Sequence, residues 1–190
     1  MLCRDEILQI FRELGALHEG HFLLTSGRHS ARYLQCAQVL KHPDTAARLC
    51  RSLAEEVQEK ELDLCVGPAL GGIIVAYEMG RSLGVPAVFT EREEEKMTLR
   101  RGFSVEPGQK VLVVEDVVTT GGSVREVMEV VRQAGGLVTE VAVLVDRSGG
   151  SLAFDVPLRS LLSLTVESYM PEKCPQCRRG LPLVKPGSRK

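Results

Sequence analysis

The stretch that decides the fold is VLVVEDVVTTGGSV, from Val111 to Val124. Its first part is a continuous apolar run, which is typical of a parallel strand covered on both faces. Its second part is rich in Thr, Gly and Ser, which indicates a turn, and the helical pattern that follows extends to about residue 134. The stretch therefore predicts a buried strand, an acidic pair and a turn that enters a helix.

Outward from this stretch, short apolar strands alternate with helical patterns. The alternation predicts an α/β fold with an open, mostly parallel sheet flanked by helices, and we see neither an internal repeat nor a linker. We therefore expect a single domain over residues 1–190. The other strands of this sheet are predicted over residues 62–66, 86–90, 137–145 and 157–164, and helices over residues 5–17 and 73–83 and from residue 43 onward.

Composition narrows the classes of partner. The chain has 24 Lys and Arg against 25 Asp and Glu, its aromatic content is 4%, and it has no Trp. Balanced charge and few aromatic side chains argue against nucleic-acid binding. No apolar run is long enough to cross a membrane, and the first residues do not form a secretory signal. We expect a cytoplasmic protein that binds neither nucleic acid nor membrane.

The acidic pair and the turn after it indicate a ligand. Glu115 and Asp116 suit vicinal hydroxyls, while the backbone N–H groups and hydroxyls of residues 119–123 suit a phosphate at a helix N-terminus. An ordinary capped turn is the alternative, but the complete order of strand, acidic pair and Thr-Thr-Gly-Gly disfavours it. Neither a Walker A loop nor Gly-x-Gly-x-x-Gly is present. A ribose 5-phosphate fits the pattern.

This stretch resembles the signature with which type I phosphoribosyltransferases bind phosphoribosyl pyrophosphate (PRPP). Three further segments resemble orotate phosphoribosyltransferases: LLTSGRHS at 23–30, GPALGGI at 67–73 and VDR at 145–147. The Cys-Pro-x-Cys tail is similar to that of one subgroup of these enzymes, so the resemblance covers essentially the whole chain. It implies a type I phosphoribosyltransferase fold with a core at about 41–149 and a small hood at about 1–40 and 150–190.

The resemblance also implies the activity and its residues. The family transfers the 5-phosphoribosyl group from PRPP to orotate, with Mg²⁺, giving orotidine 5'-monophosphate and pyrophosphate in de novo pyrimidine synthesis. Thr119 and Arg147 would bind orotate, because the planar fork of an arginine matches a carboxylate. PRPP would bind at Glu115, Asp116, Val117, Val118, Thr119, Thr120, Gly121, Gly122 and Ser123.

Residues 91–105 are densely charged and weakly periodic, and we expect them to form a long, mobile loop. In the resembled family this loop closes over the active site of the neighbouring subunit, which implies a homodimer with shared active sites. Arg92 and Lys96 fall where that loop contacts pyrophosphate, so they are the predicted catalytic residues. Arg100 and Arg101 are additional candidates.

Four positions depart from the pattern of many relatives. Thr25 and Gly71 stand where those relatives have Lys, Glu93 stands where they have a basic residue, and Thr98 replaces a loop His. The pyrophosphate end of the site is therefore expected to be less basic than in those relatives.

Cys174 and Cys177 have the spacing of half a zinc site. The tail has no second pair, and all four histidines lie far upstream. We therefore assign no metal ligands and favour free or paired surface thiols, with a zinc site shared across a dimer as the alternative.

Two other functions compete with orotate phosphoribosyl transfer. A purine phosphoribosyltransferase would share the PRPP loop, but the loop at 26–28 and Arg147 favour an acidic pyrimidine. A PRPP-sensing regulator would need an additional DNA-binding domain or a basic face, and the net charge of −1 speaks against both.

Overall fold

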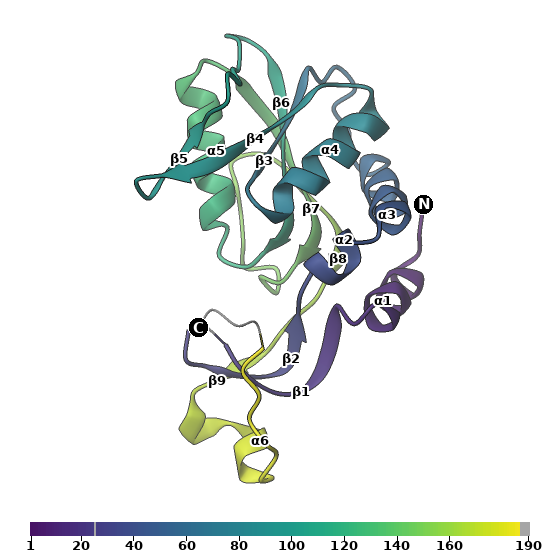
Figure 1. Ribbon diagram of the computed structural model, residues 1–190, viewed down its shortest axis with the longest axis vertical. Helices are drawn as coiled ribbons and strands as arrows, with labels where there is room; N and C mark the ends of the chain where they lie inside the picture. The colour runs from purple at the N-terminus through teal and green to yellow at the C-terminus, as the bar shows by residue number, and fades with distance from the viewer. Residues whose placement is uncertain (25, 187–190) are drawn as a thin grey trace.

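The computed structural model describes residues 1–24 and 26–186, so Thr25 and the last four residues lie outside the description (Figure 1). The helices are α1 (Arg4–Glu13), α2 (Ala37–Leu40), α3 (Pro43–Ala54), α4 (Gly71–Leu83), α5 (Gly122–Gln133), the 3₁₀ turn η1 (Pro171–Lys173) and α6 (Pro175–Arg178). The strands are β1 (Leu17–Leu23), β2 (His29–Leu34), β3 (Leu64–Pro68), β4 (Ala87–Glu93), β5 (Lys96–Leu99), β6 (Lys110–Val118), β7 (Leu137–Asp146), β8 (Leu158–Ser163) and β9 (Ser168–Tyr169).

The larger sheet has the strand order β5-β4-β3-β6-β7-β8. All its neighbouring strands are parallel except β5, which runs antiparallel to β4. Helices α3 and α4 cover one face and α5 covers the other (Figure 1). The predicted open, mostly parallel sheet flanked by helices is confirmed.

Strand β6 lies at the centre of this sheet and contributes side chains to the apolar clusters on both faces. Val111 and Val113 pack in the apolar cluster under α5, whereas Leu112 and Val114 pack in the cluster under α3 and α4. Successive side chains of a strand point to opposite faces. A strand covered on both faces is therefore apolar at consecutive positions, which is the pattern of residues 111–114.

The smaller sheet has the order β1-β2-β9, and both of its pairings are antiparallel. The register of β1 against β2 shifts between Glu19 and Phe22, which marks a bulge. Beyond α6 the chain returns to β1, where Val184 bridges Phe22 in parallel. The smaller sheet and this returning tail form a second lobe below the larger sheet (Figure 1).

The charged segment 91–105 is not one long loop, and that prediction was wrong. Strand β4 continues to Glu93, and Glu94 and Glu95 turn the chain with φ of 47° and 68°. Strand β5 then returns, with Met97 buried at 9% exposure against α5. The alternation of Met97 and Leu99 with polar neighbours is a strand pattern, but it spans only one short strand.

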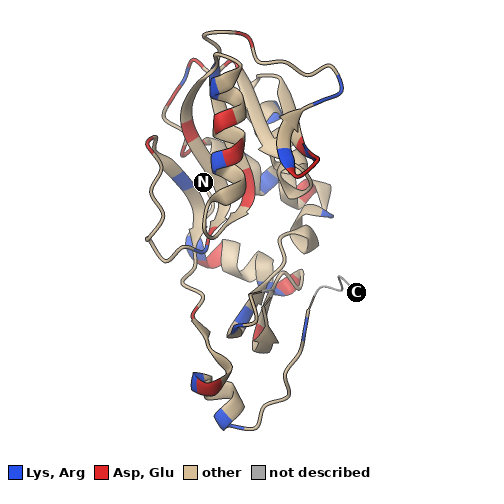
Figure 2. Ribbon diagram, turned by 90° about the vertical axis from the view of Figure 1, so that its left-hand side faces the viewer, with Lys and Arg blue, Asp and Glu red and all other residues tan. Residues whose placement is uncertain are grey.

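Charges of both signs are interspersed over the two lobes (Figure 2). Within the described part of the chain, no helix combines the length and the apolar composition needed to cross a membrane.

Candidate active site

The acidic pair lies near the carboxyl end of β6, where ligands bind in open α/β sheets. Glu115 accepts a hydrogen bond from the Ser123 hydroxyl at 3.2 Å and another from the Asp116 backbone N–H at 3.1 Å. Asp116 accepts one from the Val117 N–H at 2.9 Å. These contacts hold the two carboxylates beside the start of α5.

Burial strongly affects the charge of this pair. Removal from water and the neighbouring Asp116 carboxylate raise the pKa of Glu115 to about 8. Burial also raises the pKa of Asp116. Hydroxyl donors or a cation would stabilise the charged forms, so the pair is suited to bind such groups.

The N-terminus of α5 presents backbone N–H groups that no side chain caps. Its N-cap, Gly121, has a φ of 78°, and a Cβ there would lie 2.8 Å from the Leu152 side chain. Only glycine fits this position without strain. Thr119 and Thr120 are exposed immediately before it. The turn thus offers N–H groups and hydroxyls to an anion, as predicted for a phosphate site.

The segment between β3 and α4 lies against the acidic pair. A Cβ at Gly71 would lie 2.6 Å from the carboxylate carbon of Asp116, and one at Gly72 would lie 3.3 Å from Glu115 Oε1. A side chain at Gly71 would therefore require the Asp116 carboxylate to shift, and glycine leaves this carboxylate where it is. The sequence alone carried no signal of this contact.

Arg147 follows β7, the strand paired with β6, and its backbone N–H donates to the Val118 carbonyl at 2.8 Å. Its Nε is buried and has no hydrogen-bond partner within the described part of the chain. Burial lowers the pKa of this guanidinium. A buried guanidinium with an unused donor is prepared for an anionic partner.

The predicted loop cations lie elsewhere. Arg92 forms an ion pair with Glu126 of α5 at 2.9 Å, and with Lys96 it lines an open hollow of about 520 Å³ beside that helix. Neither Glu115 nor Asp116 lines this hollow. Arg101 pairs with Glu91 at 3.1 Å. Within one chain, the structure does not bring the loop cations to the acidic pair.

The expectation that the cysteine pair consists of surface thiols was wrong for Cys174. His21 and His29 lie beside Cys174 and Cys177, and Cys174 is fully buried rather than a surface thiol. The small sheet and the tail bring these residues together although they are far apart along the chain.

Comparison with known proteins identifies the class of protein to which this chain is similar. Residues 36–168 match the model of the phosphoribosyl transferase domain, which places the chain in the class of phosphoribosyltransferases. The solved structure of orotate phosphoribosyltransferase from Aeropyrum pernix superposes with a TM-score of 0.68 at 29% identity. The superposition covers 83% of this chain and 93% of the Aeropyrum pernix chain. The predicted type I phosphoribosyltransferase fold is confirmed.

Relatives that are similar in sequence identify the family more narrowly than the domain match does. The orotate phosphoribosyltransferase of Pelotomaculum thermopropionicum is 59% identical over 189 residues, which is 100% of either chain. That of Heliobacterium modesticaldum is 58% identical and covers 99% of this chain and 100% of its own. The chain belongs to the orotate phosphoribosyltransferase family. The prediction of a pentosyltransferase enzyme of this kind is confirmed over the purine enzyme and the regulator.

Proposed function

We propose that this chain transfers the 5-phosphoribosyl group of PRPP to orotate through the groups at the carboxyl edge of the large sheet. The observation that carries the proposal is the convergence of three features on the neighbouring strands β6 and β7. These are the buried acidic pair, the start of α5, which no described side chain caps, and Arg147 Nε, which has no partner among the described residues. The product is orotidine 5'-monophosphate, made in the cytoplasm as a step of pyrimidine synthesis.

Each feature takes one part of the substrates. Glu115 and Asp116 accept hydrogen bonds from the 2- and 3-hydroxyls of the ribose. Residues 119–123 hold the 5-phosphate with backbone N–H groups and hydroxyls. Arg147 binds the orotate carboxylate, because its free donors need an anion, and Thr119 also contacts the base. Val117 and Val118 carry the backbone between these groups.

The transfer needs no protein nucleophile. The N1 of orotate forms a bond to the anomeric carbon while the bond from that carbon to pyrophosphate breaks, and the electron pair leaves with the pyrophosphate. The proton that N1 loses passes to the leaving pyrophosphate or to solvent. The carboxylate oxygens of Glu115 and Asp116 are hard ligands of the kind that suits Mg²⁺. Burial disfavours their charged forms and raises their pKa values, and a nearby cation would stabilise those charged forms. Mg²⁺ supplies charge neutralisation for the leaving group when it is bound.

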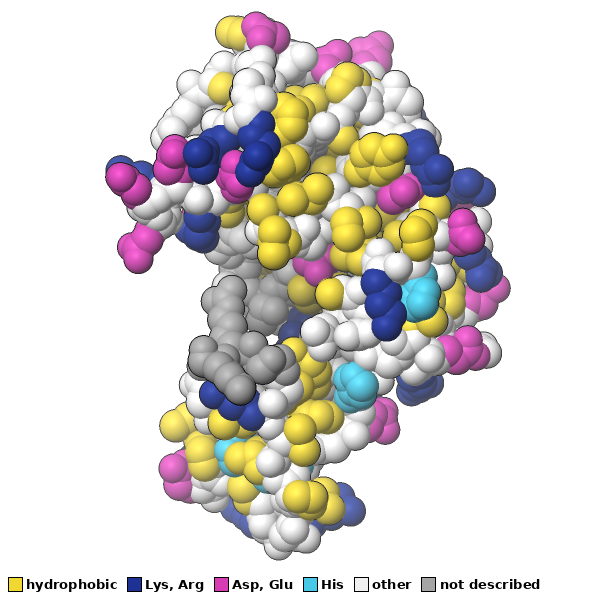
Figure 3. Space-filling model, viewed as in Figure 1, with side chains coloured by type: hydrophobic (Ala, Val, Ile, Leu, Met, Phe, Trp, Pro, Cys, Tyr) yellow, Lys and Arg dark blue, Asp and Glu magenta, His cyan; other side chains and the backbone are white. Residues whose placement is uncertain are grey.

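The loop cations act across a dimer. Arg92 and Lys96 lie away from the acidic pair of their own chain, and we assign them to the pyrophosphate of the partner subunit. Leu70, Ile74 and Tyr77 supply an apolar surface on and beside α4, with exposures of 82%, 40% and 66%. Hydrophobic side chains gather over this part of the molecule (Figure 3). An exposed apolar patch of this kind is typical of a protein interface.

The first test is consumption of orotate by the purified chain with PRPP and Mg²⁺, repeated with adenine, xanthine and uracil. We expect turnover of orotate alone, and only with PRPP and Mg²⁺ together. Turnover of another base would contradict the role of Arg147. Turnover that Asp116→Asn leaves unchanged would contradict the role of the acidic pair.

The shared site has its own test. Lys96→Ala and Asp116→Asn are each expected to be nearly inactive, and mixing them should restore about a quarter of the activity. Random pairing makes half of the dimers mixed, and each mixed dimer has one intact site. No recovery after the subunits have exchanged would contradict action across the dimer.

A further inference from the structure

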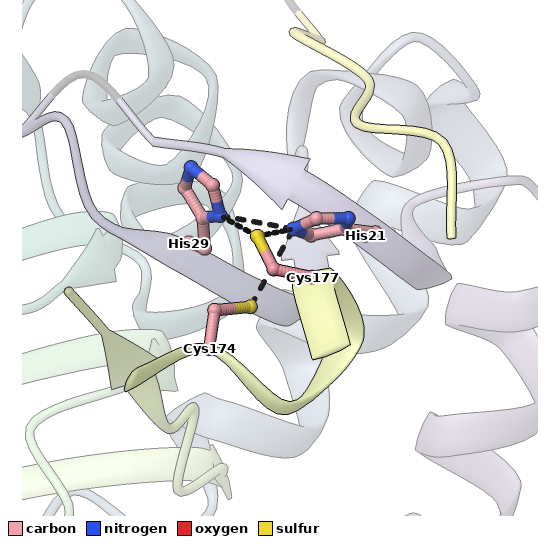
Figure 4. A group of neighbouring side chains, drawn as sticks. All are labelled: His21, His29, Cys174 and Cys177. Atoms are coloured by element: carbon pink, nitrogen blue, oxygen red, sulfur yellow. Dashed lines mark hydrogen bonds between the residues drawn. The ribbon is translucent and has the colours of Figure 1, made fainter. Parts of the chain in front are cut away.

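Four potential metal ligands converge in the small lobe, outside the active site. His21 comes from β1, His29 from the start of β2, Cys174 from the residue before α6, and Cys177 from α6 itself. Their ligand atoms all lie within 4.8 Å of one another. The side chains point toward a common centre (Figure 4). Elements from both ends of the described chain therefore meet at one point.

The distances match those around a tetrahedral ion. Cys174 Sγ lies 3.5 Å from His21 Nε2, and Cys177 Sγ lies 3.6 Å from the same nitrogen and 3.2 Å from His29 Nδ1. Around zinc, bonds of about 2.3 Å to sulfur and about 2.0 Å to nitrogen place such pairs about 3.5 Å apart. The two nitrogens are 2.9 Å apart, and an ion would separate them to about 3.3 Å.

The surroundings orient the ligands. His21, His29 and Cys174 are buried, with exposures of 4%, 5% and 0%. His21 Nδ1 lies 2.9 Å from the Leu181 carbonyl oxygen, to which it donates, so its Nε2 carries the lone pair that faces the other three residues. A backbone acceptor on the outer nitrogen is typical of histidines that bind metals. With the two thiols deprotonated, the cluster gathers lone pairs and negative charge in a buried space, and a cation balances that charge.

Local backbone features create this arrangement. The bulge in β1 lies between Glu19 and Phe22, and a bulge redirects the side chain that it carries, here His21. Pro175 begins the turn between the two cysteines, and the N–H of Gly180 donates to the Cys177 carbonyl at 3.0 Å. The turn folds the two thiols toward the same side as the histidines.

We propose that the chain binds one zinc ion through His21, His29, Cys174 and Cys177. Two thiolates and two imidazoles are a borderline-soft set, which favours zinc over Mg²⁺ or Ca²⁺. With four protein ligands the site has no open position, so the ion is structural rather than catalytic.

The ion would connect the tail to the small sheet. The tail already exchanges backbone hydrogen bonds with β1, from the Leu23 N–H to the Val184 carbonyl at 2.9 Å and from the Val184 N–H to the His21 carbonyl at 2.8 Å. Residues 26–28 lie between the two histidine ligands, and Arg28 Nε donates to Ser168 Oγ at 2.8 Å. The zinc ion therefore braces both ends of this turn.

The test measures zinc by elemental mass spectrometry on the full chain, purified without a histidine tag or chelator and supplied with zinc under reducing conditions. We expect one zinc ion per chain, and loss of nearly all of it in Cys177→Ser and His29→Asn. Cys3→Ser and His18→Asn are matched controls, because both residues are exposed and lie outside the cluster. Both controls should keep the zinc.

Cobalt substitution of the wild-type chain decides the outcome even if the variants fail to fold. Tetrahedral Co²⁺ with thiolate ligands gives intense visible bands and sulfur-to-metal charge transfer, and zinc should displace both. Wild-type chain that binds neither ion after reduction overturns the proposal, and so does a Cys174–Cys177 disulfide that persists in reductant. Zinc that survives in folded Cys177→Ser and His29→Asn also overturns it.

Discussion

In the large sheet, β6 and β7 bury mainly Val, Leu and Ala, with the carboxylates of Glu115, Glu140 and Asp146 among them. The small sheet buries a larger share of polar groups, His21, His29 and Ser30, beside the apolar Leu17, Phe22 and Leu34. Apolar side chains need no particular partner, so the stability of the large sheet is spread over many contacts. Buried polar groups must each be satisfied, so the small sheet depends on a few specific partners. At the edge of the large sheet, Arg147 Nε has no hydrogen-bond partner among the residues that the structure describes.

The largest expected effect tests the apolar side of this comparison. Leu112 is fully buried in β6, and Leu112→Ala should lower the free energy of unfolding by about 2–5 kcal/mol. Urea denaturation measures this loss. Leu112→Ile is the matched control, with an expected cost below about 1.5 kcal/mol. Equal losses in the two variants would show that packing of the large sheet is not the source of its stability.

Arg147→Ala tests whether the free donor at the sheet edge serves a ligand. We expect kcat/KM for orotate to fall about 100-fold, because loss of a buried charged partner costs about 3 kcal/mol. The KM for PRPP and the unfolding free energy should change little, because Arg147 Nε has no partner within the described residues. Arg147→Lys keeps the charge without the fork, and we expect little rescue. Full activity in the lysine variant would argue against two-point binding of the carboxylate.

Metal removal tests the small sheet. Chelation should speed amide hydrogen exchange at Leu23 and Val184, whose N–H groups join β1 to the tail, and leave β6 unchanged. The expected loss in local opening free energy is about 3 kcal/mol for an ion present at a hundred times its Kd. This prediction depends on the proposed zinc site. A uniform change over both sheets would contradict a role confined to the small lobe.

The last prediction concerns the pH dependence of stability at the acidic pair, where the change over any single pH unit is the smallest of these effects. Burial and Asp116 raise the pKa of Glu115 from 4.5 to about 8. Between these pH values the folded chain holds a proton that the unfolded chain has released. The unfolding free energy should therefore fall as pH rises through this range, by up to about 1 kcal/mol per pH unit, and level off above it. In Glu115→Gln, denaturation at several pH values should show a much shallower fall, and an unchanged slope would contradict the assignment to Glu115.

The central part of the fold could be predicted because its information is contiguous. The apolar run, the acidic pair and the turn lie within residues 111–124, and hydrogen bonds such as Ser123 to Glu115 join near neighbours. Local periodicity and turn chemistry are sufficient for such a unit. The hairpin within 91–105 was missed because Glu94 and Glu95 adopt left-handed φ without the Gly or Asn that usually signals it.

The histidine and cysteine cluster could not be predicted from the sequence. His21 and Cys174 are 153 positions apart, and only the antiparallel pairing of β1 with β2 and the return of the tail bring them together. The contact between Gly71 and Asp116 was invisible for the same reason, since it joins two separate strand ends. Spacing along the chain carries no signal for either contact.

The returning tail also determines when the small sheet can be completed during synthesis of the chain. Strands β1 and β2 leave the ribosome before any strand of the large sheet, yet β9, both cysteines and Val184 follow after β8 has completed that sheet. At about 5–20 residues per second, the first strands wait roughly 10 s or more for their last partners. The small sheet is therefore begun before the large sheet and finished after it, and in the interval its strand edge and two histidines are open to chaperones, metal ions and other nascent chains.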